Sequence, residues 1–402
     1  MRILYVISNP FYYTLSPIGG SISSGTGVIK SLDKKGHKID ILSDDKLPTI
    51  KGSESINYIF FKNLLIRKFL FENKKIIPFR IYNFLNNSLF KLSIRFTMSA
   101  LLRKQKYDLV YIRASHFAYL ALYFAKNSNL KSILEVNKPL SMQSFNRKGG
   151  FSNLKRDSVK KISSEIKQYE YSDLISIDSK LRSKWILKFV DKKFKNKILI
   201  NHNGVDQDLF FPSESSIRSN IVGMASSFRW YNDIDELMNI IHRVINRKKE
   251  VIFKLFIGDR SKKIEIDSKI ESYGLKDSIV SEYEIPLNKM PEKMSECNIL
   301  ISHFNFHGVW PHICSIKHLE YMALSKPVVA TNAGEVNFAI KHGHNGILVN
   351  EGDENGFANA IIKLLDNKKF ATKLGINGRK DVINNHTWDK HVDKFMDSYE
   401  NL

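Results

Sequence analysis

Apolar residues in this chain of 402 residues fall into short β-branched runs that alternate with segments of helical periodicity. In the first half, the runs predict strands at Ile3–Ile7, Lys38–Leu42, Ile56–Phe61, Leu109–Arg113, Ser132–Val136 and Leu174–Ile177. Helical patterns lie between them, notably at Ile22–Lys34, Phe117–Lys126, Asp157–Tyr169 and Leu181–Phe189. Such an alternation predicts a doubly wound parallel sheet covered by helices.

The second half repeats this alternation. Strands are predicted at Ile221–Ala225, Ile252–Ile257 and Ile299–Ser302, and helices at Ile234–Ile245, Ile264–Tyr273, Glu354–Leu365, Phe370–Asn384 and Trp388–Tyr399. A chain of this length is long for one core. We therefore expect an α/β protein with two Rossmann-like domains, at 1–195 and 196–375, followed by C-terminal helices at 376–402.

The stretch Pro311–Asn332 is the most informative part of the second half. Its pattern predicts a loop, a short helix, a turn at Lys326-Pro327 and a buried strand at Val328–Thr331. The helix start would present unpaired backbone N–H groups at Cys314, Ser315 and Ile316, which form a favourable site for an anion. Lys317 follows at once, and Glu320 lies one turn further along.

Glu320, Tyr321-Met322-Ala323 and Pro327-Val328-Val329-Ala330 resemble the signature of the retaining glycosyltransferases related to glycogen synthase and bacterial mannosyltransferases, glycosyltransferase family four. The resemblance implies that Glu320 binds the ribose of a nucleotide and that the helix start holds its diphosphate. The family's first acidic position, which contacts the donor sugar, is His312 here. The alternative is an ordinary crossover helix on which Glu320 is solvated.

Other segments resemble the same family in chain order. Gly19-Gly20 would let the backbone approach the donor phosphate, and Arg229 would neutralise the diphosphate. Asn232 stands where the family has a second cation, and Asn203–Asp206 matches its hinge, where Asn-Gly indicates a turn. The resemblance implies the GT-B fold, in which the two domains face a cleft and the last helices cross back to the first domain.

Polar residues also follow two predicted strands of the first half. Arg113 and Lys138 would meet phosphate or acceptor, and His116 would be a polar contact on the acceptor side. Ligands of α/β sheets bind at these strand ends. A single histidine at a helix start is also common as a structural residue.

The net charge is +21, which indicates an anionic partner. Eleven Lys or Arg residues and one acidic residue lie in 62–106, together with many large apolar residues. This mixture predicts a surface that binds anionic lipid, and the alternative is a pair of core-packing helices with solvated lysines. The sequence contains no motif for nucleic-acid binding.

Two cysteines, Cys297 and Cys314, cannot form a disulfide framework, and the first apolar run is too short for a signal peptide. We expect a cytoplasmic protein, peripheral on the inner face of the cell membrane. Asp233-Ile-Asp235 resembles the metal-binding motif of a different sugar-transferase class, but it starts an amphipathic helix, where acids favour the dipole. We therefore expect no metal and no cofactor.

The resemblance implies a retaining glycosyltransferase whose donor is a nucleoside diphosphate sugar, and we expect it to act without a metal. The acceptor would be a glycan or a lipid-linked glycan, in the synthesis of surface polysaccharide or glycolipid. Two alternatives remain open. One is an epimerase or phosphorylase on the same architecture, and the other is a catalytically degenerate partner subunit that binds nucleotide sugars, to which His312 and Asn232 point.

Overall fold

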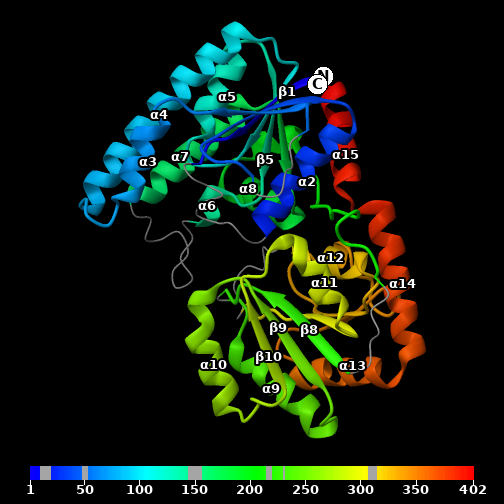
Figure 1. The fold of residues 1–402 in the computed structure, drawn as a ribbon. Coiled ribbons are helices and arrows are strands. Elements are labelled where there is room, and N and C mark those ends of the chain that lie inside the picture. The colour runs from blue at the N-terminus through cyan, green and yellow to red at the C-terminus, as the bar shows by residue number, and fades with distance from the viewer. Residues whose placement is uncertain (10–19, 48–52, 144–155, 214–219, 230, 307–314) are drawn as a thin grey trace. The chain divides into compact units, whose positions relative to one another are not determined.

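The computed structural model describes residues 1–9, 20–47, 53–143, 156–213, 220–229, 231–306 and 315–402, and Figure 1 draws the other residues in grey. Contacts divide the chain into two compact units. Unit 1 comprises Met1–Pro17, Val28–Asn201 and Val392–Leu402, and unit 2 comprises Ile18–Gly27 and His202–His391.

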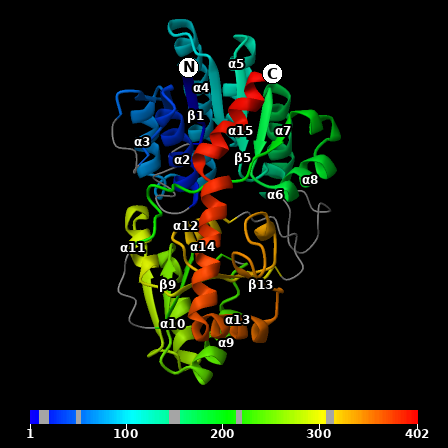
Figure 2. The same cartoon turned by 90° about the vertical axis from the view of Figure 1, so that its right-hand side faces the viewer.

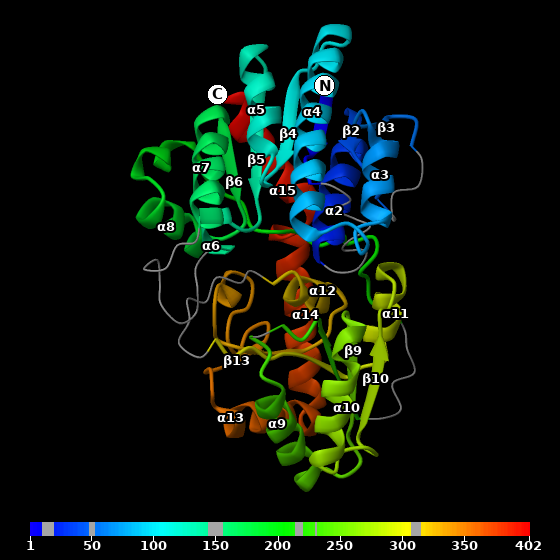
Figure 3. The same ribbon diagram turned by 90° about the vertical axis from the view of Figure 1, so that its left-hand side faces the viewer.

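Unit 1 contains a parallel sheet with the strand order β3-β2-β1-β4-β5-β6-β7. Its strands are β1 (Arg2–Ile7), β2 (Lys38–Ser43), β3 (Ile56–Phe60), β4 (Leu109–Arg113), β5 (Lys131–Val136), β6 (Leu174–Ile177) and β7 (Ile198–Ile200). Its helices are α2 (Gly20–Lys34, which both units share), α3 (Leu64–Glu72), α4 (Phe79–Lys104), α5 (Ala118–Asn127), α6 (Leu140–Gln143), α7 (Arg156–Tyr171) and α8 (Lys180–Phe189). Figures 1 and 3 show α4, α5 and α7 on one face of this sheet, and the end of α15 (Trp388–Glu400) on the other.

Unit 2 contains a second parallel sheet, with the strand order β10-β9-β8-β11-β12-β13. Its strands are β8 (Ile221–Ser226), β9 (Ile252–Ile257), β10 (Ile279–Tyr283), β11 (Ile299–Ser302), β12 (Val328–Thr331) and β13 (Ile347–Val349). Its helices are α9 (Ile234–Arg247), α10 (Lys263–Ser272), α11 (Met290–Ser295), α12 (Lys317–Ala323), α13 (Glu354–Asp366) and α14 (Lys368–Asn385). Unit 2 also contains the short 3-10 segments η3 (Arg260–Lys262), η4 (Leu287–Lys289) and η5 (Val336–Phe338), whereas η2 (Lys192–Lys197) belongs to unit 1.

The predicted fold class, with two Rossmann-like α/β domains, is confirmed. The central strands match their β-branched runs because both faces are buried, as in β4 and β12, where every residue is buried. The sequence patterns did not predict β7 in the first sheet, or β10 and β13 at the two edges of the second sheet. β10 is mostly half-buried and mixes polar with apolar residues, and β7 and β13 are only three residues long, so none of them gives a strong strand signal.

The two compact units differ from the predicted domain boundaries at two points. Residues 196–201 belong to unit 1, because β7 pairs with β6 and extends the first sheet. Helix α14 belongs to unit 2, where it packs on α12 (Figure 2), so the C-terminal residues that join unit 1 begin at Val392 and not at 376.

The Asn203-Gly204 pair, predicted as a turn, instead lies in an extended segment with a bridge from Val205 to Thr387. The N–H of Val205 donates to the carbonyl of His386 at 2.9 Å. A Cβ atom on Gly204 would lie 2.5 Å from the backbone of Thr387. Glycine is therefore required here for close approach of two backbones rather than for a turn.

The core of unit 2 has one cluster on each face of the sheet. Alternate residues of β8 point to opposite faces, so that Met224 packs with α9 and α13 while Ala225 packs with α12. All residues from His318 to Leu324 are buried in or beside the second cluster. This packing fixes α12 against the sheet, with α14 behind it.

Gly375 and Gly378 on α14 give a matched test of this packing. A Cβ on Gly375 would collide with the backbone carbonyl of Ser325, in the turn between α12 and β12, whereas a Cβ on Gly378 would meet its neighbours at 3.3–3.5 Å. Alanine normally favours a helix over glycine by up to about 1 kcal/mol. We predict that Gly375→Ala lowers the free energy of unfolding by about 1–3 kcal/mol, while Gly378→Ala changes it little.

Urea denaturation of both variants measures this difference. A Gly375→Ala protein as stable as Gly378→Ala would show that α14 is not held against the Ser325 turn.

Candidate functional site

The strand order of the second sheet reverses between β8 and β11, and in α/β sheets ligands bind at the carboxyl ends of the strands that flank such a point. β8 ends at Ser226 and β11 ends at Ser302. The loop that carries Arg229 follows β8, and residues 303–306 follow β11. Both segments therefore leave the sheet at its candidate binding edge.

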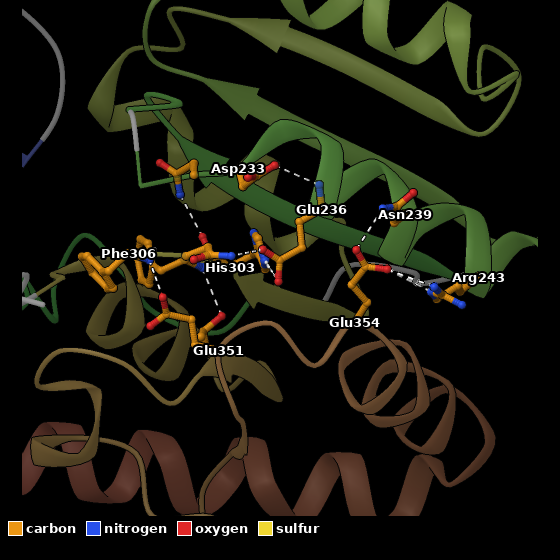
Figure 4. Close-up of polar contacts among 12 residues, drawn as sticks. Asp233, Glu236, Asn239, Arg243, His303, Phe306, Glu351 and Glu354 are labelled. Atoms are coloured by element: carbon orange, nitrogen blue, oxygen red, sulfur yellow. Dashed lines mark hydrogen bonds and ion pairs between the residues drawn. The ribbon is translucent and has the colours of Figure 1, made fainter. Parts of the chain in front are cut away.

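Hydrogen bonds from three directions hold residues 303–306. The N–H of Phe304 donates to the hydroxyl of Thr331 at 3.0 Å, and the N–H of Asn305 donates to the carbonyl of Tyr231 at 2.8 Å. The N–H of Phe306 donates to the carboxylate of Glu351 at 2.7 Å (Figure 4). The loop after β11 is thus fixed immediately before residue 307.

Asn232 joins the loops after β8 and β11. Its side-chain oxygen accepts from the Ser226 hydroxyl at 2.9 Å, and its amide nitrogen donates to the carbonyl of His303 at 2.8 Å. Asn232 is buried. In the family that the sequence resembles, a cation stands at this position. Here Asn232 instead connects two loops.

Glu236, in the first turn of α9, lies beneath the same loop. Its carboxylate is 3.3 Å from Nε2 of His303 and accepts from the Asn305 amide at 2.5 Å (Figure 4). His303 is 1% exposed. A buried carboxylate needs polar partners of this kind, so the contacts of Glu236 tie the loop to α9.

Two side chains of α12 bind the sheet directly. The hydroxyl of Tyr321 accepts from the N–H of Ala225 at 2.9 Å. β8 pairs with β11 at Val222 and Gly223, so Ala225 lies in the part of β8 after this pairing. Nε2 of His318 lies 2.9 Å from the Ser302 hydroxyl. Complete burial lowers the pKa of His318 to about 4, so its imidazole is neutral at pH 7.

Lys317 and Glu320 lie one turn apart on α12. The Lys317 ammonium is 3.8 Å from the Glu320 carboxylate; the Glu320 side chain is only 4% exposed, and that of Lys317 is 30% exposed. The N–H of Lys317 donates to the Ser315 hydroxyl at 3.3 Å, beside Ile316. The structure therefore brings together four of the predicted residues, Ser315, Ile316, Lys317 and Glu320.

Arg229 is exposed and lies in the loop after β8, directly after Phe228, whose φ of 44° is positive. Its charge acts on Asp259, at the end of β9. The pKa of Asp259 is lowered mainly by a hydrogen bond from Ser261 and partly by the positive charge of Arg229. Arg229 thus places a cation at the edge formed by β8 and β9.

Of the polar residues predicted in the first half, Arg113 contacts the neighbouring strand at the carboxyl edge of the first sheet. Arg113 lies 3.6 Å from the carboxylate of Glu135, which also accepts from Asn137 at 2.6 Å. His116 is half-buried after β4, and its carbonyl accepts from the Ser164 hydroxyl at 2.7 Å. The acceptor roles of Arg113 and His116 stay predictions.

Some predicted residues cannot be placed. Gly19, His312 and Cys314 lie outside the described residues, and Gly20 is the first residue of α2. Asp233-Ile-Asp235 starts a helix, as predicted: the carboxylate of Asp233 accepts from the N–H of Glu236 and caps α9, and Asp235 pairs with Lys269. Among the described residues, no three His, Cys, Asp or Glu side chains form a group that could hold a metal ion.

With this geometry established, comparison with known families identifies the segment. Residues 206–381 match the family of glycosyl transferases group 1. This group 1 segment contains the β8–β11 edge, Arg229 and the whole of α12.

An uncharacterized glycosyltransferase of Methanocaldococcus jannaschii is 27% identical over 224 residues, which cover 55% of this chain and 58% of that protein. The chain spans about half the length of the curated relatives that it matches.

Two solved structures are similar over the whole chain. Sucrose-phosphate synthase from Thermosynechococcus elongatus has a TM-score of 0.72 at 17% identity and covers 100% of this chain and 98% of its own. Anabaena HepE, in complex with UDP and glucose, has a TM-score of 0.71 at 14% identity and covers 100% of both chains. These neighbours are GT-B glycosyltransferases, and the present chain shares their two-domain fold.

Sequence reasoning missed the buried pair of His303 and Glu236 in the group 1 segment. A signal was present, because His303 directly follows the predicted strand Ile299–Ser302, at the end where α/β sheets bind ligands. Its partner Glu236 lies in α9, and the local pattern of residues around His303 does not indicate that contact.

A separate pocket of about 340 Å³ lies between β13 and α13 and is lined by residues that include His342, Val349, Asp353 and Phe370. None of the residues predicted to bind the donor lines it.

The neutral state of His318 gives a prediction for stability against pH. Its folded pKa of about 4 lies below the unfolded value of 6.5, so the unfolded chain binds a proton more readily. The stabilisation is present above pH 6.5 and is lost as the pH falls toward 4, by on the order of 3 kcal/mol. We expect His318→Gln to lose less stability over this window than the parent.

Urea titrations at several pH values between 6.5 and 4 measure the two slopes. Equal slopes in the parent and in His318→Gln would show that His318 is not a neutral buried group.

Proposed function

We propose that the protein is a glycosyltransferase that moves a sugar from a nucleoside diphosphate sugar to a glycan or lipid-linked glycan, with retention of configuration, in the synthesis of surface polysaccharide or glycolipid. The observation that carries this proposal is the fixed position of Lys317 and Glu320 on α12, within a segment that matches the group 1 family. The UDP and glucose bound to the structurally similar HepE make a UDP-hexose the first donor to test.

Charge complementarity supports a donor site in unit 2. The carboxylate of Glu320 would accept hydrogen bonds from the ribose hydroxyl groups, as the family resemblance implies. The Lys317 ammonium and the Arg229 guanidinium would face the diphosphate, and the fork of Arg229 suits phosphate oxygens. Ser315 and Ile316 at the helix start complete this set, together with the unplaced Gly19, His312 and Cys314.

The proposed reaction breaks the bond between the anomeric carbon and the diphosphate oxygen, and the bonding electrons leave with the diphosphate. An acceptor hydroxyl forms the new bond on the same face of the sugar, and its proton passes to the leaving diphosphate. No protein nucleophile takes part. Arg229 and Lys317 would stabilise the charge that develops on the diphosphate without a metal, and His116 would contact the acceptor.

A thermal-shift screen followed by a turnover assay tests this function. We expect one nucleoside diphosphate sugar to raise the melting temperature, because a ligand at one hundred times its Kd stabilises the native state by about 2.7 kcal/mol. The same donor should then be hydrolysed slowly or transferred to an acceptor by the purified protein. Binding without any turnover would contradict the enzyme proposal and leave a donor-binding partner subunit.

We predict that Glu320→Gln weakens donor binding about 10- to 100-fold, since a hydrogen bond to a charged group contributes about 1.5–3 kcal/mol. The change keeps the shape of the side chain, so the melting temperature without ligand should fall little. Isothermal titration calorimetry measures the affinity.

Glu292→Gln on α11 is the matched control, because Glu292 is an exposed glutamate on another short helix of unit 2. Unchanged affinity in a folded Glu320→Gln protein would remove Glu320 from the proposed site.

A further inference from the structure

Helix α3 (Leu64–Glu72) buries a charged residue and exposes large apolar residues, which is the reverse of a usual surface helix. Its one buried residue is Arg67, whose side chain is 0% exposed. Leu65, Ile66 and Phe69 are 82%, 54% and 63% exposed. A surface helix of a soluble domain normally turns such residues toward the core, so this helix presents its apolar face outward.

Arg67 fixes that orientation. Its guanidinium makes two contacts with the buried carboxylate of Asp44, one of them at 2.6 Å, and lies 4.9 Å from the centre of the Phe90 ring. Breaking a buried ion pair of this kind is costly, because it leaves an uncompensated charge. Rotation of α3 to bury Leu65 and Phe69 would break the contacts of Arg67 with Asp44. The ion pair therefore stabilises the orientation in which these apolar residues are exposed.

Helix α4 (Phe79–Lys104) extends the same apolar surface. Phe90, Ile94 and Met98 are buried in the core of unit 1. The opposite side of the helix exposes Ile81, Leu85, Leu92 and Phe96. Phe79 at its start and Ile76 in the turn before it are exposed as well. Figure 3 shows α4 on the outer face of unit 1, with α3 beside it. The core-packing alternative thus holds for one side of α4 and is wrong for the apolar residues on the other.

The charge around this surface is almost entirely positive. Ten of the eleven Lys and Arg residues in 62–106 are exposed, and Glu72 is the one acidic residue of that segment. A second copy of the chain would bring the same positive charge to the interface, which disfavours self-association through this face. Nucleic acid would use the cations but not the exposed aliphatic side chains.

An anionic lipid surface matches both properties. We propose that residues 62–106, the α3–α4 hairpin, bind the surface of a membrane that contains anionic phospholipid, with the exposed apolar residues at the acyl boundary and the lysines and arginines at the headgroups. None of the described helices is long and apolar enough to cross a membrane. The proposal does not depend on the glycosyltransferase activity.

Vesicle flotation of the full chain tests the proposal. We expect recovery with vesicles of phosphatidylcholine and phosphatidylglycerol, much less with phosphatidylcholine alone, and release in 1 M salt, where the Debye length is about 3 Å. No recovery with the anionic vesicles, or equal recovery with both, would overturn it.

Two pairs of variants separate the apolar and the charged contributions. Leu65→Ser with Phe69→Ser should weaken binding by about tenfold or more, because it removes two apolar side chains from the bound surface. Ile264→Ser on α10 is its control, since Ile264 is 85% exposed in unit 2. Equal losses in the Leu65/Phe69 variant and the control would place the binding surface elsewhere.

The charged pair is Lys74→Glu with Lys75→Glu, in the turn between α3 and α4, which should also weaken binding by about tenfold or more. The neighbouring exposed lysines Lys368 and Lys369, each changed to Glu, are the matched control in unit 2. If both charge variants weaken binding equally, the attraction is general and the hairpin has no special role. A parent that is dimeric in solution and becomes monomeric in the Leu65/Phe69 variant would instead identify a second copy as the occupant.

Discussion

The burial of every residue of α12 after Lys317 constrains the rest of unit 2. A seven-residue helix has little stability of its own, and this one carries His318, Glu320 and Tyr321 into the interior. Buried polar groups must find partners, and Tyr321 binds Ala225 while His318 contacts Ser302. The helix is therefore held in one position, and the positions of Lys317 and Glu320 follow from it.

The loop after β11 is held by a different set of contacts. Asn232 and Glu236 bind it from the start of α9, and Thr331 and Glu351 bind it from the other side. Together with α12, these contacts fix the residues on both sides of 307–314. Charged groups that are positioned before a ligand arrives lose less energy to reorganisation, which favours both binding and charge stabilisation.

The sequence indicated the parts of this arrangement that are local. Short apolar runs located β11 and β12, and the spacing after Ile316 located α12 and Glu320. It did not indicate contacts between residues that are far apart in the sequence, such as His303 with Glu236. The residues next to each side chain carry no information about such a partner. For 62–106 the sequence left an exposed apolar surface and a core-packing pair of helices open, because the outward face of α3 depends on the pairing of Arg67 with Asp44. The roles of the site residues stay predictions.

Hydrogen exchange measured with and without UDP tests the central claim, that the nucleotide binds at the β8–β11 edge beside α12. The account predicts slower amide exchange in peptides from 226–229 and 315–324 when UDP is bound, because the ligand contacts both segments. It predicts no change around His342, Val349 and Phe370, which line the separate pocket. Protection at that pocket, with none at 226–229 or 315–324, would contradict the account.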